Sequence, residues 1–192
     1  IRHAKKALSE GADGLILVCA GAGGHAGTLS PFALVREVRE FFDGPIALSG
    51  SISEGSSVLS ALALGADFAY VGTKFIATEE ANASPGYKQM IIDSTADDIM
   101  YSATFTGVNG NYLRPSVEAA GLNPEEHTSG SKDDMNFSTS AIAKKDNSSK
   151  AWKDIWGSGQ GIGSIKDAPS VQTAVDQMVS EYEDAKLRLD NF

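Results

Sequence analysis

A single histidine, His25, stands among four glycines in the stretch AGAGGHAGT, which covers residues 20–28. Imidazole titrates near neutral pH, so it can take a proton from a carbon acid or, once protonated, stabilise a bound anion. The stretch follows the apolar run LILVC, and its glycines let a ligand ring lie close to the histidine. These features predict a binding loop with His25 as the candidate catalytic residue. His3 and His127 lack such surroundings and are expected at the surface.

Two further strand ends carry glycines beside hydroxyl side chains, in LSGSI (residues 48–52) and VGTKF (residues 71–75). Bare backbone and hydroxyl groups suit a phosphate, because backbone N–H groups can point at the anion without a side chain intervening. The expected phosphate ligands are Gly50, Ser51, Gly72 and Thr73. The other residues expected to contact a cofactor are Gly23, Gly24 and Ser49.

The segment GAGGHA, residues 21–26, also matches the G-x-G-x-x-G/A fingerprint of dinucleotide-binding folds. Two details disfavour this interpretation. The fingerprint should run directly into a helix, whereas the helix pattern here begins later, at Ser30-Pro31. The acid that binds the ribose should end the next strand, but that strand ends in Ser49-Gly50 and Asp43 precedes it.

A repeated phrase predicts the architecture. LSEGADGLILV (residues 8–18) and LALGADFAYVG (residues 62–72) each read as a helix end, a Gly-Ala-Asp turn and a short buried strand. Between them, a helix from Ser30-Pro31, a strand at residues 46–50 and a helix at about 55–64 give an α-β-α-β-α-β order. This order predicts a parallel sheet with crossover helices. Three strands cannot close a barrel, so they are either the last three of eight or half of an open sheet.

The remainder of the chain reads differently. Residues 84–104 predict helix, residues 121–150 are polar and predict a long loop or insertion, and an amphipathic helix is expected from about Pro169 to Leu189. The segment at residues 152–165 places tryptophans beside a glycine loop. Trp152, Trp156 and Phe137 either wall a substrate cavity or pack the insertion.

The composition excludes some classes of function. A net charge of −9 and a pI of about 4.7 argue against nucleic-acid binding and an anionic membrane surface. The one cysteine, Cys19, allows no internal disulfide, and no membrane span or signal peptide is visible, so we expect a cytoplasmic protein. No metal-ligand spacing occurs. The chain starts with Ile1 in what reads as a helix already under way, so we expect an N-terminal truncation.

The segments GAGGHAGTLSPFALV, GPIALSGSISEGSSVLSALALGADFAYVGTKFIATEEA and GQGIG resemble the nitronate monooxygenase family, once called 2-nitropropane dioxygenases. The resemblance implies an α/β fold, the (β/α)8 TIM barrel with an inserted cap and non-covalent FMN. The chain looks like the C-terminal part of a member, holding the last three barrel strands and a mostly helical inserted segment. We therefore expect barrel at residues 1–83, cap at 84–150, and a return to the barrel at 151–192.

Several residues match family motifs. The histidine of the A-G-G-H motif falls on His25, the Gly-Thr after the last strand on Gly72 and Thr73, and the late Gly-Gln on Gly159 and Gln160, which is expected near the flavin. The family's Gly-Gly after the seventh strand falls on Gly50 and Ser51, so the second glycine is replaced. Val18 stands where many members carry a glutamine that contacts the flavin.

The resemblance implies oxidation of a nitronate, an alkyl nitronate or propionate 3-nitronate, by O2 to a carbonyl compound and nitrite. The alternative within the superfamily is an FMN-dependent NAD(P)H reductase acting on enoyl-ACP or a quinone. A non-catalytic flavin- or phosphate-binding module is the alternative from another class. The expected partners are the nitronate and O2, and no binding to nucleic acid or a membrane is expected. Formation of a homodimer is an open alternative.

Overall fold

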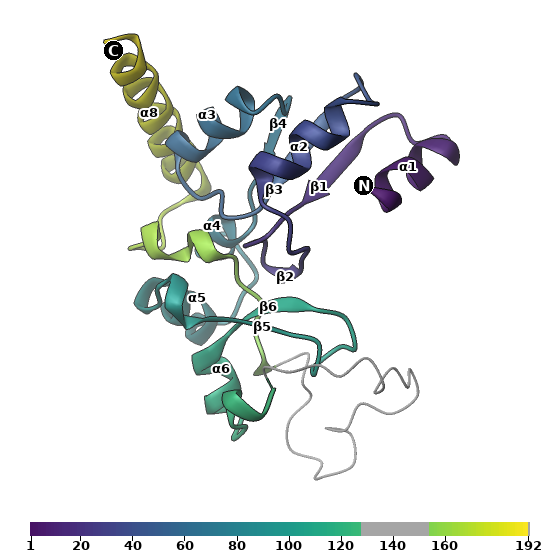
Figure 1. Ribbon diagram of the computed structural model, residues 1–192. Helices are drawn as coiled ribbons and strands as arrows, with labels where there is room; N and C mark the ends of the chain where they lie inside the picture. Colours follow the sequence, from purple (N-terminus) through teal and green to yellow (C-terminus); the bar gives the residue numbers. More distant parts are fainter. Residues whose placement is uncertain (128–153, 192) are drawn as a thin grey trace.

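The computed structural model describes residues 1–127 and 154–191 and contains two small sheets (Figure 1). The first sheet is parallel, with the strand order β1-β3-β4. Its register pairs Leu15 with Ile46, and Ser49 with Tyr70. The strands are β1 (Leu15–Val18), β3 (Ile46–Ser49) and β4 (Phe68–Tyr70).

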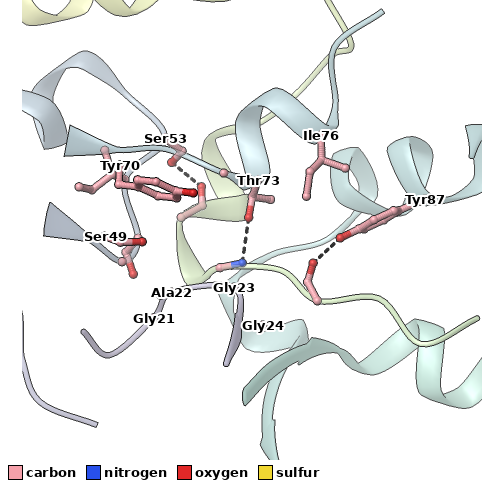
Figure 2. Close-up of a pocket in the computed structure, with 17 residues that line it drawn as sticks. Gly21, Ala22, Gly23, Gly24, Ser49, Ser53, Tyr70, Thr73, Ile76 and Tyr87 are labelled. Atoms are coloured by element: carbon pink, nitrogen blue, oxygen red, sulfur yellow. Dashed lines mark hydrogen bonds between the residues drawn. The ribbon is translucent and has the colours of Figure 1, made fainter. Parts of the chain in front are cut away.

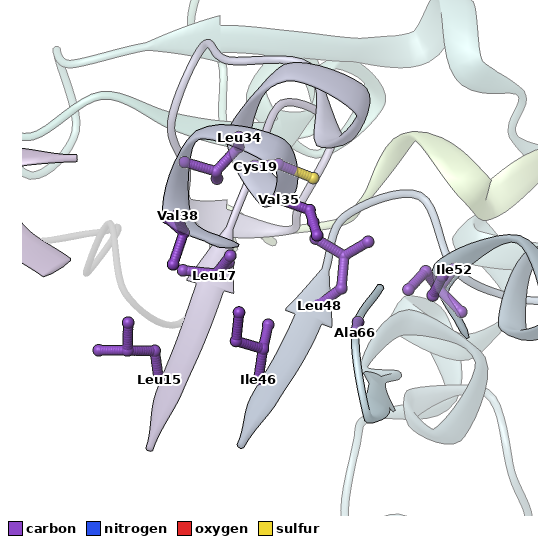
Figure 3. Close-up of a cluster of buried hydrophobic side chains, with 11 residues drawn as sticks. Leu15, Leu17, Cys19, Leu34, Val35, Val38, Ile46, Leu48, Ile52 and Ala66 are labelled. Carbon is purple, nitrogen blue, oxygen red and sulfur yellow. The ribbon is translucent and has the colours of Figure 1, made fainter. Parts of the chain in front are cut away.

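Helices lie before and between these strands, as the sequence predicts. They are α1 (Arg2–Ser9), α2 (Pro31–Arg39) and α3 (Gly55–Ala63). Helix α2 turns Leu34, Val35 and Val38 toward the sheet, where they pack against Leu17 and Ile46 (Figure 3). Val35, Val38 and Ile46 are fully buried, so this cluster is the core that fixes the three strands.

The opposite face of the parallel sheet stays exposed. Alternate residues of β1 and β4 point there, and the exposed fractions reach 57% for Ile16, 60% for Phe68 and 54% for Tyr70. Side chains alternate between the two faces of a strand, so these apolar residues form one surface. In a closed barrel they would face the interior, as expected for the last three of eight strands.

A second, antiparallel sheet lies below the first, with the order β2-β6-β5 (Figure 1). Its strands are β2 (Gly24–His25), β5 (Ile99–Ser102) and β6 (Gly110–Leu113). The prediction of helix over residues 84–104 is right for α5 (Pro85–Asp93) and for the short 3₁₀ helix at residues 96–98, and wrong from residue 99, where β5 begins. Ser94 adopts an extended backbone that ends the helix, and the alternate burial of Met100 and Ser102 suits a strand against β6. The shorter helices nearby are α4 (Thr73–Ile76), η1 (Ala96–Asp98), α6 (Arg114–Ala119) and η2 (Pro124–His127).

The chain closes with the 3₁₀ helix η5 (Gln160–Ser164) and the helix α8 (Val171–Asp190), which confirms the predicted C-terminal helix. Helix α8 packs beside α3 (Figure 1). A Cβ built on Gly55 would lie 2.0 Å from the carbonyl oxygen of Met178, so the two helices need a glycine where they cross. Of the described helices, none is long and apolar enough to cross a membrane.

A charged pair joins the amino-terminal ends of β3 and β4. Arg39, the last residue of α2, donates to the carbonyl oxygens of Gly65 (2.8 Å) and Gly44 (2.6 Å) and to Oδ2 of Asp67 (2.8 Å). The same carboxylate oxygen accepts the N–H of Ile46 at 2.8 Å. The Ile46 N–H, and after it the Arg39 guanidinium, lower the pKa of Asp67 below its ordinary 3.8.

This lowered pKa predicts an acid-dependent contribution to stability. The folded state favours ionised Asp67, so the contribution is present above about pH 3.8 and is lost as pH falls through the lower folded pKa. Asp67→Asn should reduce the free energy of unfolding at pH 7, and the difference from the unsubstituted protein should shrink below pH 3.8. Urea unfolding at a series of pH values measures it.

Asp13 offers the matched control, because it holds the same place in the first Gly-Ala-Asp turn and its side chain is exposed without a hydrogen bond to any described residue. Asp13→Asn should leave the free energy of unfolding nearly unchanged. A difference for Asp67→Asn that stays constant down to pH 2.5 would contradict the proposed ionisation.

Candidate active site

The carboxyl ends of β1, β3 and β4 open into one cavity of about 310 Å³ (Figure 2). Parallel strands bring their carboxyl ends to one edge of a sheet, so the three loops that follow them meet there. Segments from the second sheet and from residues 157–161 complete the wall. The lining residues are Gly21–Gly24, Ser49–Ser53, Tyr70, Gly72, Thr73, Ile76, Tyr87, Gly157, Gly159 and Gly161.

Most of the predicted cofactor ligands line this cavity. They are Gly23, Gly24, Ser49, Gly50, Ser51, Gly72 and Thr73. Two of the predicted site residues do not line it. His25 follows the lining residue Gly24 and is exposed, and Gln160 lies between the lining residues Gly159 and Gly161. The structure thus gathers all three predicted loops and places His25 at their border.

The glycine loop after β1 is held by the segment at residues 157–161. The carbonyl oxygen of Gly21 accepts two N–H groups, from Ser51 at 3.2 Å and from Gln160 at 2.9 Å. A Cβ on Gly23 would lie 2.8 Å from the backbone nitrogen of Gly159, so the loops touch backbone to backbone. Glycine is therefore needed here for close approach.

Thr73 contributes a hydroxyl to the cavity wall. Its Oγ1 accepts the N–H of Gly159 at 3.0 Å, as the dashed line in Figure 2 shows. A threonine hydroxyl has one hydrogen and two lone pairs, so this contact leaves the hydrogen available for an anion. A Cβ on Gly72 would meet nothing within 4 Å, so bare backbone faces open space next to Thr73.

Ser51 stands at a position where the resemblance described above implies glycine. Its φ is +56°, a left-handed conformation that favours glycine, and it is the one described non-glycine residue with positive φ. Its N–H is bonded to the carbonyl oxygen of Gly21, so the hydroxyl is the Ser51 group left for the phosphate role expected from the sequence. The Ser51 hydroxyl packs directly against Gly21, because a Cβ on Gly21 would lie 2.1 Å from its Oγ.

His25 lies on β2, whose two residues pair with Gly110 and Asn111 of β6. Its Nε2 is 2.9 Å from Oγ1 of Thr106, in the loop between β5 and β6. The buried amide of Asn111 donates to the carbonyl oxygen of Ala22 at 2.7 Å and so ties the glycine loop to the second sheet.

Sequence reasoning missed two tyrosines of the cavity wall. Tyr87 on α5 stacks on Trp156, with ring centroids 4.8 Å apart, and its hydroxyl donates to the carbonyl oxygen of Gly157. Burial raises the pKa of Tyr87 to about 12, so it keeps its hydrogen at neutral pH. Tyr70 ends β4 on the exposed face of the parallel sheet. Period-two alternation along β4 could have indicated Tyr70, whereas nothing near Tyr87 marks it.

Other candidate residues take structural places. Cys19 is fully buried, its Sγ donates to the carbonyl oxygen of Ser49 at 2.9 Å, and burial raises the pKa of its thiol. Lys74 is buried and donates to Oε1 of Gln177 at 3.4 Å, outside the cavity wall. Trp156 packs on Tyr87, while Phe137 and Trp152 lie outside the described residues.

Within the described ranges, no three His, Cys, Asp or Glu side chains gather as a metal site.

Comparison with known proteins gives a consistent result. A family model described as nitronate monooxygenase matches residues 1–181. A nitronate monooxygenase from Paraburkholderia phytofirmans is 29% identical over 133 residues, which cover 65% of this chain and 36% of that enzyme.

Solved structures show the same fold. Nitroalkane oxidase from Streptomyces ansochromogenes has a TM-score of 0.73 and 25% identity, with coverage of 98% of this chain and 56% of that one. FabK from Thermotoga maritima has a TM-score of 0.74 and 24% identity, with coverage of 98% and 60%. Both are TIM-barrel enzymes, so the parallel sheet is part of a TIM barrel, as the resemblance implies. The chain spans less than two thirds of the length of each of these relatives.

The contact between the two glycine loops predicts a stability effect. Gly23→Ala would place a methyl group 2.8 Å from the backbone nitrogen of Gly159, and backbone cannot rotate away as a side chain can. We expect a loss of about 1–3 kcal/mol in the free energy of unfolding. Gly163→Ala is the control, because a Cβ there meets nothing within 4 Å. Equal urea midpoints for the two variants would contradict the close contact.

Proposed function

Because this chain belongs to the nitronate monooxygenase family, we propose that it carries the phosphate-binding loops and the catalytic histidine of an FMN-dependent oxidoreductase. The proposed reaction is the oxidation of a nitronate, either an alkyl nitronate or propionate 3-nitronate, by O2 to a carbonyl compound and nitrite. The observation that supports it most is the glycine- and hydroxyl-lined cavity at the carboxyl ends of three parallel strands. TIM-barrel enzymes keep their active sites at this end.

The cavity wall fits the phosphate end of FMN. Of the described residues that line it, none carries a charge, so a phosphate would be held by hydroxyl and backbone N–H groups. Thr73 keeps a hydroxyl hydrogen to donate, and Ser51 adds a second hydroxyl. Gly50 and Gly72 let the anion approach the backbone.

FMN would supply the electron-accepting group that passes electrons from the substrate to O2. The residues of this chain do the positioning. Gly23 and Gly24 line the cavity, and Gly24, where a Cβ would meet nothing within 4 Å, lets a planar ring lie against the backbone. Tyr70 and Tyr87 wall the cavity. His25, at the border of the cavity, takes the α-proton from a neutral nitroalkane or, once protonated, holds an anionic nitronate by its charge.

The first test measures turnover without any nicotinamide. The full-length protein that carries this chain is mixed with propionate 3-nitronate in air, and oxygen uptake is recorded. We expect uptake that needs no NAD(P)H and that His25→Ala lowers roughly 10- to 100-fold, because a charge-assisted contact to the anion is lost. His3→Ala, on the exposed surface of α1, is the control. No uptake, together with bleaching of the flavin by NAD(P)H, would favour the alternative reductase function.

The second test fills the space expected for the phosphate. Gly72→Ala adds a methyl group that meets no protein atom within 4 Å, so it occupies the cavity without straining the fold. We expect FMN affinity to fall at least about 10-fold, with an unchanged free energy of unfolding of the apoprotein. Gly163→Ala, equally free of contacts and outside the cavity wall, should keep normal affinity. Equal FMN affinity in both variants would place the phosphate elsewhere.

A further inference from the structure

The ring of His25 is anchored on one side by a loop distant in sequence. Thr106, between β5 and β6, places its Oγ1 at 2.9 Å from Nε2 of His25. The contact depends on the second sheet, because β2, which carries His25, pairs with β6 (Figure 1). The other ring nitrogen, Nδ1, makes no hydrogen bond to any described residue.

The other hydrogen-bond partners of Thr106 indicate whether its hydroxyl or the imidazole of His25 is the donor in the contact between them. Oγ1 donates its one hydrogen to the carbonyl oxygen of Val108 at 2.9 Å. Oγ1 also has two lone pairs. Nε2 of His25, at 2.9 Å, is nearer to it than the N–H of Val108 or the hydroxyl of Tyr112, each at 3.3 Å, so the imidazole takes one lone pair and the two longer contacts are left with the other. Burial raises the pKa of Tyr112 against the opposing effect of the Thr106 contact, so Tyr112 keeps its hydrogen at neutral pH and can donate. A threonine whose hydrogen is already used can only accept from the imidazole.

We propose that Thr106 is a positioning residue that holds His25 in the tautomer with hydrogen on Nε2, so that Nδ1 is the nitrogen that exchanges a proton with the substrate. This inference rests on the catalytic role proposed for His25 and adds which ring nitrogen acts. If Thr106 donated instead, Nδ1 would carry the hydrogen and could not act as a base. The tautomer of a catalytic histidine is commonly set by the partner of its other nitrogen.

The step at a neutral nitroalkane follows from this arrangement. Nδ1 takes the proton from the α-carbon, so a C–H bond breaks and an N–H bond forms. The electron pair of the C–H bond stays on the substrate, which becomes the nitronate with its negative charge on the nitro oxygens. Nε2–H remains bonded to Thr106 throughout, so the imidazolium keeps a hydrogen-bond acceptor while it carries charge.

The spectroscopic test uses full-length protein labelled with ¹⁵N-histidine. Long-range ¹H–¹⁵N spectra above the titration range of imidazole should show Nε2 of His25 protonated and Nδ1 unprotonated, with the signals assigned from His25→Gln. Thr106→Val should move both ¹⁵N shifts toward the averaged values of a free histidine, and Thr106→Ser should restore them. Thr28→Val is the control, because Thr28 is exposed and makes no hydrogen bond to a described residue.

The kinetic test separates proton transfer from oxidation. With a neutral nitroalkane, Thr106→Val should lower kcat about 3- to 10-fold with little change in KM, the effect of one neutral hydrogen bond. With the preformed nitronate, which needs no deprotonation, kcat should change far less, and Thr106→Ser should resemble the unsubstituted enzyme.

Two results would overturn the role of Thr106. One is a protonated Nδ1 in the unsubstituted protein, and the other is unchanged ¹⁵N shifts in Thr106→Val. Should Thr106→Val fail to fold, the ¹⁵N spectra of the unsubstituted protein and of Thr106→Ser still show which ring nitrogen of His25 carries the hydrogen, and so still test the role of Thr106. If the unsubstituted protein oxidises neither substrate, the proposed function fails, while the ¹⁵N spectra still report on Thr106.

Discussion

The carbonyl oxygen of Gly21 accepts N–H groups from both Ser51 and Gln160, and the geometry of the cavity depends on this shared acceptor. It joins the loop after β1, the loop after β3 and the segment at residues 157–161. Glycines at residues 21, 23 and 159 allow the approach, since a Cβ on any of them would lie within 3.0 Å of another residue. Among the residues that line the cavity, Ser51 and Thr73 then bring hydroxyl groups to its wall.

Local pattern predicted much of the fold. The Gly-Ala-Asp turns occur as expected, with Gly11 and Gly65 at positive φ and a parallel strand after each turn. Strand β5 was missed because it is stabilised by pairing with β6, and the pattern of residues 84–104 carries no information about a partner that follows. Asp67 shows the same limit, because its partners Arg39 and Ile46 are brought to it by the fold.

The candidate site divides in a similar way. Glycines and hydroxyls at strand ends are visible in the sequence, and the parallel sheet brings seven such predicted residues to one cavity. Tyr87 and the backbone of residues 157–161 could not be predicted, because nothing local says which distant segment covers a glycine loop. Ser51 was expected among the phosphate donors, and because its N–H is bonded within the protein, its hydroxyl is the group left for that role. Its left-handed φ is a conformation that favours glycine, the residue that the resemblance implies at this position.

Ligand affinity tests most directly whether the loops joined at Gly21 bind a phosphate group. Apoprotein of the full-length chain is titrated with FMN and, separately, with riboflavin, which has the same ring and sugar alcohol but no phosphate. We expect FMN to bind at least about 100-fold more tightly than riboflavin, since two or more charge-assisted hydrogen bonds to the phosphate are lost with riboflavin. Equal affinity for the two ligands would contradict it.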